Sequence, residues 1–98
     1  MAQSGMIRIS IDLKRKEAER IVAVLAFAGL SGLHHEWNEL DVAARHALEA
    51  VELGRQSGFA DSLLHGCITA ARVRQSQGDW RAADELLHEA ERIVQRTK

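Results

Sequence analysis

The sequence predicts an all-α fold in which two antiparallel helical hairpins stack on each other. Composition is the first reason, because 46% of the 98 residues are apolar, only 4% are aromatic and proline is absent. Such a composition is typical of helices that pack on helices. The second reason is an internal repeat, since Ala43 and Ala83, like Ala50 and Ala90, lie forty positions apart. Similar residues at a fixed long offset indicate a repeat architecture.

Length and net charge limit the classes of function. A chain of 98 residues forms one small domain. Its net charge of −1 gives no overall field that would hold nucleic acid or an anionic membrane. The basic cluster Lys14-Arg15-Lys16 is followed by Glu17 and Glu19, so we interpret it as the solvated start of a helix. We therefore expect no direct binding of nucleic acid or membrane.

Residues 1–11 are predicted to form an N-terminal segment, extended or disordered, ahead of a helical repeat domain over residues 12–98. From Ile7 this segment alternates apolar and polar residues, which is typical of a strand. Either the segment joins the following helix or it pairs with something outside the repeats.

A cytoplasmic location is expected. The uncharged run from Ile21 to Leu33 is too short to span a bilayer. The acidic residues before it, such as Asp12, are unfavourable for an export signal. The single cysteine, Cys67, cannot form an intrachain disulfide, and a reducing compartment is the natural setting for such a chain. On its helix Cys67 is expected to be a small packed residue.

The first hairpin, repeat 1, is predicted over about residues 21–57. Its first helix runs from about Asp12 to about Trp37, and Asn38 supplies the turn. Gly29 and Gly32 each lower helix propensity by up to about 1 kcal/mol, so we expect them to let a neighbouring helix approach closely. The second helix covers about Leu40 to Gln56 and ends at Ser57-Gly58.

The second hairpin, repeat 2, is predicted over about residues 60–97. Its first helix begins near Asp61, which is a good N-cap residue, and runs to about Gln77. Its second helix is capped by Asp79 and runs from Trp80 nearly to the end of the sequence. Neither hairpin alone is thick enough to bury its apolar face, so the two are expected to stack.

The turn and second helix of repeat 2 resemble the tetratricopeptide repeat (TPR) family. The residues that carry the resemblance are Gly78-Asp79-Trp80 with Ala83, Leu87 and Ala90, and a weaker set is Asn38-Glu39-Leu40 with Ala43, Ala47 and Ala50. The resemblance covers about residues 21–95 and implies a right-handed α-solenoid fragment. The offset of forty departs from the common repeat of about 34 residues, and the bulky residue expected near Ala47 is missing.

The longer repeat is similar to the helical sensor region of large bacterial transcription activators of the maltose-activator (MalT), LuxR-like class. Residues 44–55 and 84–92 carry this similarity. In those proteins the repeats lie between a nucleotide-binding module and a DNA-binding helix-turn-helix, and neither module is found in this sequence. The chain is therefore either a fragment of a larger regulator or a free-standing protein of two repeats.

The resemblance implies a concave groove, floored by the first helix of each hairpin, that receives a peptide or a partner helix. The predicted function is a non-catalytic protein or peptide interaction module, a regulatory scaffold or adaptor. The alternative is a small-molecule-sensing or oligomerising fragment of a MalT/LuxR-like regulator. Arg72 is the best candidate to hold a carboxylate. The ten predicted groove residues are Leu25, Ala28, Gly32, His35, Glu36, His65, Ile68, Arg72, Gln75 and Ser76.

No catalytic residue, cofactor or metal site is predicted. The five histidines include no pair spaced i, i+4 on one helix, and the sequence has no His-Glu-x-x-His or Cys-x-x-Cys motif. No serine or cysteine nucleophile with a histidine base can be argued either.

A homodimer is predicted, because solenoids of this class usually need about three repeats and neither end shows an obvious polar cap. The N-terminal segment and the last helix supply the apolar side chains that lack a neighbour in this fold. The predicted dimer-interface residues are Ile7, Ile9, Ile11, Leu13, Leu86, Ile93 and Val94.

Overall fold

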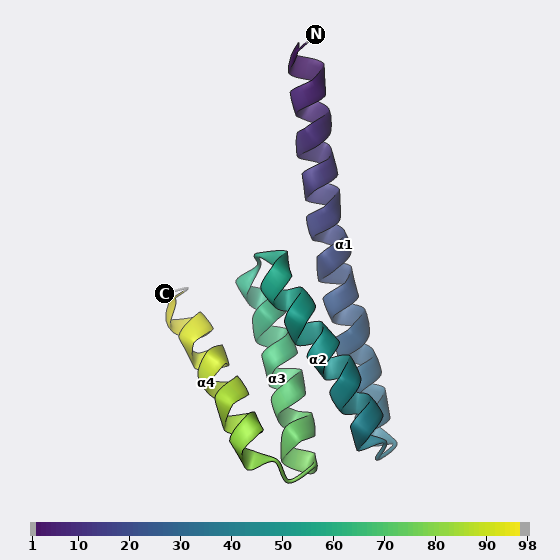
Figure 1. The fold of residues 1–98 in the computed structure, drawn as a ribbon, viewed down its shortest axis with the longest axis vertical. Coiled ribbons are helices and arrows are strands. Elements are labelled where there is room, and N and C mark those ends of the chain that lie inside the picture. The colour runs from purple at the N-terminus through teal and green to yellow at the C-terminus, as the bar shows by residue number, and fades with distance from the viewer. Residues whose placement is uncertain (1, 97–98) are drawn as a thin grey trace.

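Four helices follow one another along the chain and pack as two antiparallel hairpins (Figure 1). The computed structural model describes residues 2–96, with the side chains of residue 12 and of residues 14–96. Over this range the elements are all helical: α1 (Ala2–Glu36), α2 (Leu40–Ser57), α3 (Ala60–Ser76) and α4 (Trp80–Arg96). Each helix packs on the next, and α1 also packs beside α3. The predicted all-α fold and the predicted helix order are confirmed.

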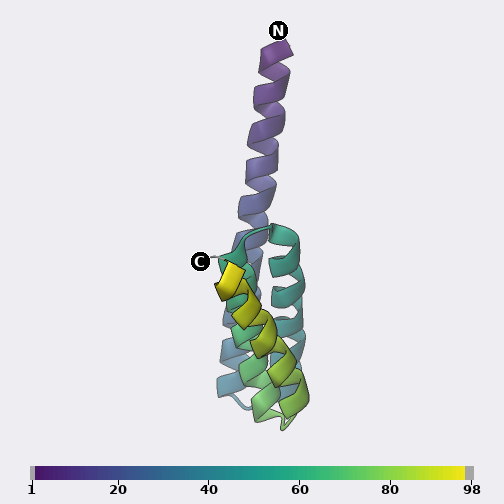
Figure 2. The ribbon, with the colours of Figure 1, turned by 90° about the vertical axis from the view of Figure 1, so that its left-hand side faces the viewer.

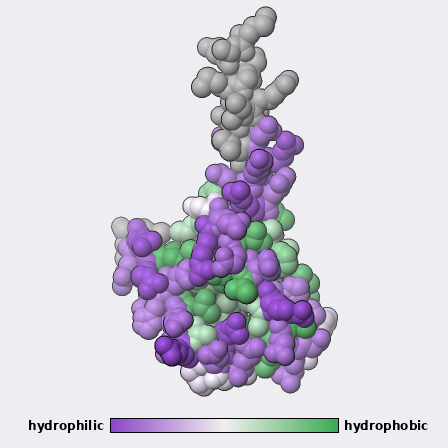
Figure 3. All heavy atoms as spheres, in the orientation of Figure 1, coloured by the Kyte–Doolittle hydropathy of each residue, from purple (hydrophilic) through white to green (hydrophobic). Residues whose placement is uncertain are grey.

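The N-terminal part of α1 projects beyond the other three helices in both ribbon views (Figures 1 and 2). This projection makes the molecule elongated, with extents of 58 × 30 × 14 Å. The helix already includes residues 2–11, so the extended or disordered alternative predicted for residues 1–11 is wrong from residue 2 onwards. The described side chains of the projecting part are hydrophilic, whereas apolar side chains gather over the packed body (Figure 3).

The two hairpins use the same turn. Asn38 and Gly78 both have left-handed backbones, with φ of 60° and 80°. In each turn the following residue donates a 2.8 Å backbone hydrogen bond into the helix before it, from Glu39 to the carbonyl of His34 and from Asp79 to that of Arg74. The sequence-predicted match between Asn38 and Gly78 is therefore confirmed in the backbone.

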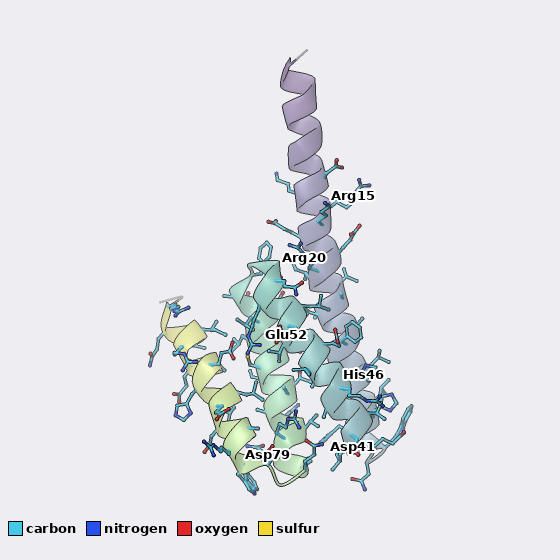
Figure 4. All side chains as sticks on the ribbon, viewed as in Figure 1. Arg15, Arg20, Asp41, His46, Glu52 and Asp79 are labelled. Atoms are coloured by element: carbon cyan, nitrogen blue, oxygen red, sulfur yellow. The ribbon has the colours of Figure 1, made fainter. Side chains whose placement is uncertain are left out.

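Asp79 caps α4 as predicted. Its Oδ1 accepts a hydrogen bond from the backbone N–H of Ala82 at 3.1 Å, which satisfies one of the free donors at the helix start. Figure 4 shows Asp79 where the turn enters α4.

The predicted cap of α3 is wrong. The helix begins at Ala60 with Phe59 at the N-cap position and no side-chain cap, so Asp61 lies inside the first turn. The hydroxyl of Ser57 organises this turn instead. It donates to the carbonyl of Gly54 at 2.8 Å and accepts from the N–H of Phe59 at 3.1 Å.

The core is built from small side chains and is shared by the two hairpins. One buried cluster joins α2, α3 and α4, and a second joins α1 to α2. The first cluster crosses the boundary between the hairpins, whereas the second lies within the first hairpin. The buried members are Ala47, Val51, Cys67, Ala70 and Ala90 in the first cluster, and Val24, Ala28 and Ala50 in the second.

Two glycines allow α2 and α3 to touch backbone to backbone. A Cβ atom on Gly54 would lie 2.8 Å from the Cα of Leu63, and a Cβ atom on Gly66 would lie 3.1 Å from the carbonyl oxygen of Ala50. Both distances are shorter than ordinary van der Waals contact. The α2–α3 interface therefore requires residues without a side chain at these two positions.

Gly29 and Gly32 of α1 do not have the predicted role. A Cβ atom on either would meet nothing within 4 Å, so no neighbouring helix approaches closely at these positions. Their lower helix propensity is therefore not compensated by a backbone contact.

The last helix packs small and apolar side chains inward, and it exposes charged side chains together with Trp80, Leu87 and Val94. Ile93 is only 7% exposed, and the partly buried Leu86 packs against the first core cluster, so the expectation that these two residues lack an apolar neighbour within the chain is wrong. Val94 is 43% exposed. The predicted interface side chains of Ile7, Ile9, Ile11 and Leu13 lie outside the described side chains. The exposed polar residues of α4 include Arg81, Asp84, Glu85, His88, Glu91 and Arg92.

Exposed apolar side chains remain at both ends of the stack. On α4 they are Trp80, Leu87 and Val94, whose spacing of seven residues places them on one side of the helix, and α1 exposes apolar side chains as well. The exposed residues therefore agree with the expectation that neither end has an obvious polar cap.

Candidate functional site: the groove between α1 and α3

A hollow of about 280 Å³ lies between α1 and α3, the first helices of the two hairpins. The two helices run side by side in the same direction (Figure 1). Small residues of α1 make the hollow possible, because Ala28, Gly29 and Gly32 carry little or no side chain. We refer to this hollow as the groove, and the residues that line it are Leu25, Ala28, Gly29, Ser31, Gly32, His35, His65, Thr69, Arg72 and Val73.

The structure brings together most of the predicted groove residues. The predicted residues that line the groove are Leu25, Ala28, Gly32, His35, His65 and Arg72. Ser76 adjoins it, because its Oγ lies 2.6 Å from Nε2 of His35 in a hydrogen bond between α3 and α1. Glu36, Ile68 and Gln75 are exposed but do not line the hollow.

Sequence reasoning missed Gly29, Ser31, Thr69 and Val73. Thr69 could have been found, since it follows His65 by one helical turn and so lies on the same face. Ser31 and Val73 could not be found from helix periodicity alone, because both are buried and only their edges reach the groove. The Ser31 hydroxyl donates to the carbonyl of Ala43 at 2.8 Å, which ties α1 to α2 beneath the groove.

The polar lining of the groove favours an acidic ligand. No residue that lines it is a carboxylate, whereas Arg72, His35 and His65 all carry nitrogen donors. Among the described residues the Arg72 guanidinium has neither a hydrogen bond nor an ion pair, and it is exposed. A guanidinium in that state can bind a carboxylate through two parallel hydrogen bonds.

A second cluster of rings lies between α1 and α2. The ring of His46 stacks on Phe27 at 5.9 Å and on His34 at 5.3 Å between centroids, and His34 meets Trp37 edge to face at 5.5 Å. Nδ1 of His34 is buried and makes no hydrogen bond, although a Glu39 oxygen lies 3.5 Å away. The cluster packs the first hairpin at its turn, and sequence reasoning did not find it. Figure 4 shows His46 on α2.

An ion pair at the surface of the protein joins α2 to α4. Arg55 donates to both oxygens of Glu89, from Nη2 at 2.9 Å and from Nε at 3.3 Å, and also to Glu52 at 2.6 Å. The hydrogen bond to Glu89 is the main reason that the pKa of Arg55 is raised. Sequence spacing does not reveal this pair, because the two residues lie on different hairpins.

Cys67 is a packed residue, as predicted. Its side chain is fully buried, and burial is the main reason that the pKa of its thiol is raised to about 11. The neighbouring Glu89 raises it further, whereas Arg55 and Arg92 oppose the shift. A thiol in this state is a poor nucleophile, because the thiolate is the reactive form.

The described residues contain no group of three or more histidine, cysteine or acidic side chains placed to hold a metal ion. None of the helices, over the range that the structure describes, has both the length and the apolar character needed to cross a membrane.

Comparison with known proteins identifies the repeat. The family model of the MalT-like TPR region matches residues 7–98, which is nearly the whole chain. No curated protein and no solved structure matches the chain. The match agrees with the two stacked hairpins and with the common turn built around Asn38 and Gly78. The chain therefore belongs to the family of the MalT-like TPR region.

Proposed function

We propose that the chain is a non-catalytic module that binds a protein or peptide segment through the groove between α1 and α3. The observation that carries this proposal is the unpaired guanidinium of Arg72 beside a hollow without carboxylates. An extended peptide with an acidic side chain or a terminal carboxylate fits this lining best, because Arg72, His35 and His65 can all donate to it. A cytoplasmic setting is part of the proposal.

Two features support a binding surface over a merely structural contact. The groove is floored by Ala28, Gly29 and Gly32, so a ligand can approach the α1 backbone without displacing a bulky side chain. The hydrogen bond between His35 and Ser76 fixes α1 against α3 at one end of the groove. A surface held in place before binding loses less conformational entropy when a ligand arrives.

Selection of displayed random 12-residue peptides on the immobilised chain tests the proposal. Selected peptides are expected to be enriched in acidic residues, and fluorescence polarisation gives their dissociation constants. Arg72→Gln should weaken binding by roughly tenfold to a hundredfold, since it removes a charge-assisted hydrogen bond. Gly32→Leu should weaken it too, because the added side chain enters open space in the groove.

Arg81→Gln is the matched control, because Arg81 lies on α4 with its side chain 93% exposed, outside the groove. It should leave binding unchanged. Selected peptides that bind the Arg72→Gln and Gly32→Leu variants as tightly as the unaltered chain would contradict the proposed site.

The family match supports a second candidate, a small-molecule-sensing or oligomerising piece of a MalT-like regulator. In this reading the groove of about 280 Å³ takes a metabolite in place of a peptide. A thermal-shift screen of metabolites separates the two candidates, because a ligand that binds the folded state raises Tm with its excess over Kd. A metabolite that raises Tm in the unaltered chain but not in Gly32→Leu would favour sensing.

A further inference from the structure

The two ends of the groove differ. At one end the hydrogen bond of 2.6 Å between Nε2 of His35 and Oγ of Ser76 joins α1 to α3, and we call this contact the bridge. Among the side chains that the structure describes, it is the one hydrogen bond between these two helices. At the other end Leu25 is 56% exposed, and α1 continues past it as the projecting helix (Figures 1 and 2). A ligand chain can leave the groove past Leu25, whereas at the bridge it meets a contact that spans both helices.

Arg72 lies just inside the bridge. It precedes Ser76 by four residues on α3, which is roughly 6 Å along the helix axis. On the far side of the bridge the charge is of opposite sign, because Glu36 follows His35 on α1 and is exposed. A negative charge is therefore favoured inside the groove, beside Arg72, and disfavoured beyond the bridge.

The apolar end of the groove lies at a definite distance from Arg72. The bridge sets His35 level with Ser76, so Arg72, four residues before Ser76, is about level with Ser31, four residues before His35. Leu25 precedes Ser31 by six residues, which is roughly 9 Å along the axis of α1. An extended chain covers that length in about three residues. A ligand with a carboxylate on Arg72 thus brings a side chain two or three positions earlier beside Leu25.

We infer that the groove takes the C-terminal end of a polypeptide, with its terminal carboxylate on Arg72 and an apolar side chain beside Leu25. The inference rests on the proposed function and selects a chain terminus over an internal acidic residue. An internal residue at Arg72 needs the chain to continue on both sides, and on one side the bridge and Glu36 oppose it. A terminal carboxylate needs no such continuation, and its two oxygens match two parallel donors of the guanidinium.

Selection from two libraries of random 12-residue peptides on the immobilised full chain tests the inference. In the first library each peptide is fused to its carrier through its N-terminus and ends in a free carboxylate. In the second the carrier continues after the peptide, so no terminus is free. Binders that depend on Arg72 are expected from the first library, with an apolar residue two or three positions before the last.

The two libraries separate failure of this inference from failure of the proposed function. Arg72-dependent binders of equal affinity from the second library would overturn the chain terminus as ligand, while the proposed function would stand. The absence of Arg72-dependent binders from both libraries would overturn the proposed function as well.

A synthetic copy of a selected peptide, labelled at its N-terminus, tests the carboxylate contact by fluorescence polarisation. Replacing the terminal carboxylate by an amide should raise Kd about tenfold or more for the unaltered chain. In Arg72→Gln the same replacement should change Kd less than about twofold, because the partner of the carboxylate is already missing. An equal effect of the amide in both proteins would overturn the assignment of the carboxylate to Arg72.

Two glycines added after the last residue of the same peptide test the closed end. The longer peptide should bind the unaltered chain about tenfold more weakly, because its terminus can no longer stop before the bridge. His35→Ala removes the bridge and should reduce this ratio of Kd values, in which a general effect on affinity cancels. Gln75→Ala is the matched control, since Gln75 is exposed next to Ser76 but does not line the groove. Equal ratios in the two variants would show that the bridge does not stop the ligand.

Discussion

At the scale of single residues, the thiol of Cys67 links the stability of the fold to alkaline pH. The thiol is fully buried, and its pKa is raised from an ordinary value of 9.0 to about 11. Folding therefore holds the proton more tightly than the unfolded chain does. The resulting stabilisation is fully present below pH 9 and is lost as the pH rises from 9 to 11.

We expect the free energy of unfolding to fall by about 2–3 kcal/mol across this pH range from the ionisation of Cys67. Urea denaturation at a series of pH values measures the fall. In Cys67→Ala the fall should be smaller, whatever the cost of the substitution at neutral pH. If the free energy of unfolding fell equally with pH in the two proteins, Cys67 would have the same pKa in the folded and unfolded states.

At the scale of the helices, glycine has opposite effects on stability at different positions. Gly54 lets α2 and α3 touch, whereas Gly32 in α1 faces open space. Alanine raises helix propensity at both positions by about 1 kcal/mol. Only at Gly54 does the added methyl group collide with the backbone of a neighbouring helix.

Gly54→Ala should therefore destabilise the protein, because overpacking of about 1–3 kcal/mol exceeds the gain in propensity. Gly32→Ala should stabilise it by up to about 1 kcal/mol. Thermal and chemical denaturation of both variants measure the difference. If Gly54→Ala were as stable as Gly32→Ala, the α2–α3 contact would be looser than the structure has it.

The helices and turns could be predicted from the sequence because their causes are local. The turns at Asn38 and Gly78 and the cap at Asp79 follow from residues within a few positions of each other. The role of Gly54 could not be predicted in this way, because the crossing of α2 and α3 decides it. The sequence of one helix does not show where a neighbouring helix will cross it.

The same limit applies to the groove. Residues such as Gly32, His65 and Arg72 followed from the resemblance, because the repeat fixes which side of each first helix faces inward. Whether the buried Ser31 and Val73 reach the groove depends on how far apart α1 and α3 lie. The packing of both helices on α2 sets this distance. The apolar periodicity of one helix does not predict it.

At the scale of the whole molecule, the shared core should make the two hairpins unfold together. Ala47 and Val51 of the first hairpin lie in one cluster with Cys67, Ala70 and Ala90 of the second. The ion pair between Arg55 and Glu89 also crosses this boundary. Loss of either hairpin would expose apolar surface on the other.

Trp37 and Trp80 offer one probe in each hairpin. In Trp37→Phe and Trp80→Phe, each of which keeps a single tryptophan, fluorescence should give the same urea midpoint as circular dichroism of the same variant. Both tryptophans are more than half exposed, so neither substitution removes a core side chain. Separate fluorescence and circular dichroism midpoints would show that the hairpins unfold independently.

The close contact between α2 and α3 limits how this array can be lengthened by duplication of a hairpin. At the offset of forty positions, a copy of α1 and α2 would bring Ala26 to the place of Gly66, and a copy of α3 and α4 would bring Val94 to the place of Gly54. Either copy puts a side chain where the two helices touch backbone to backbone. A duplicated hairpin is therefore expected to need a glycine restored at its new junction before the longer array packs as closely as α2 and α3 do.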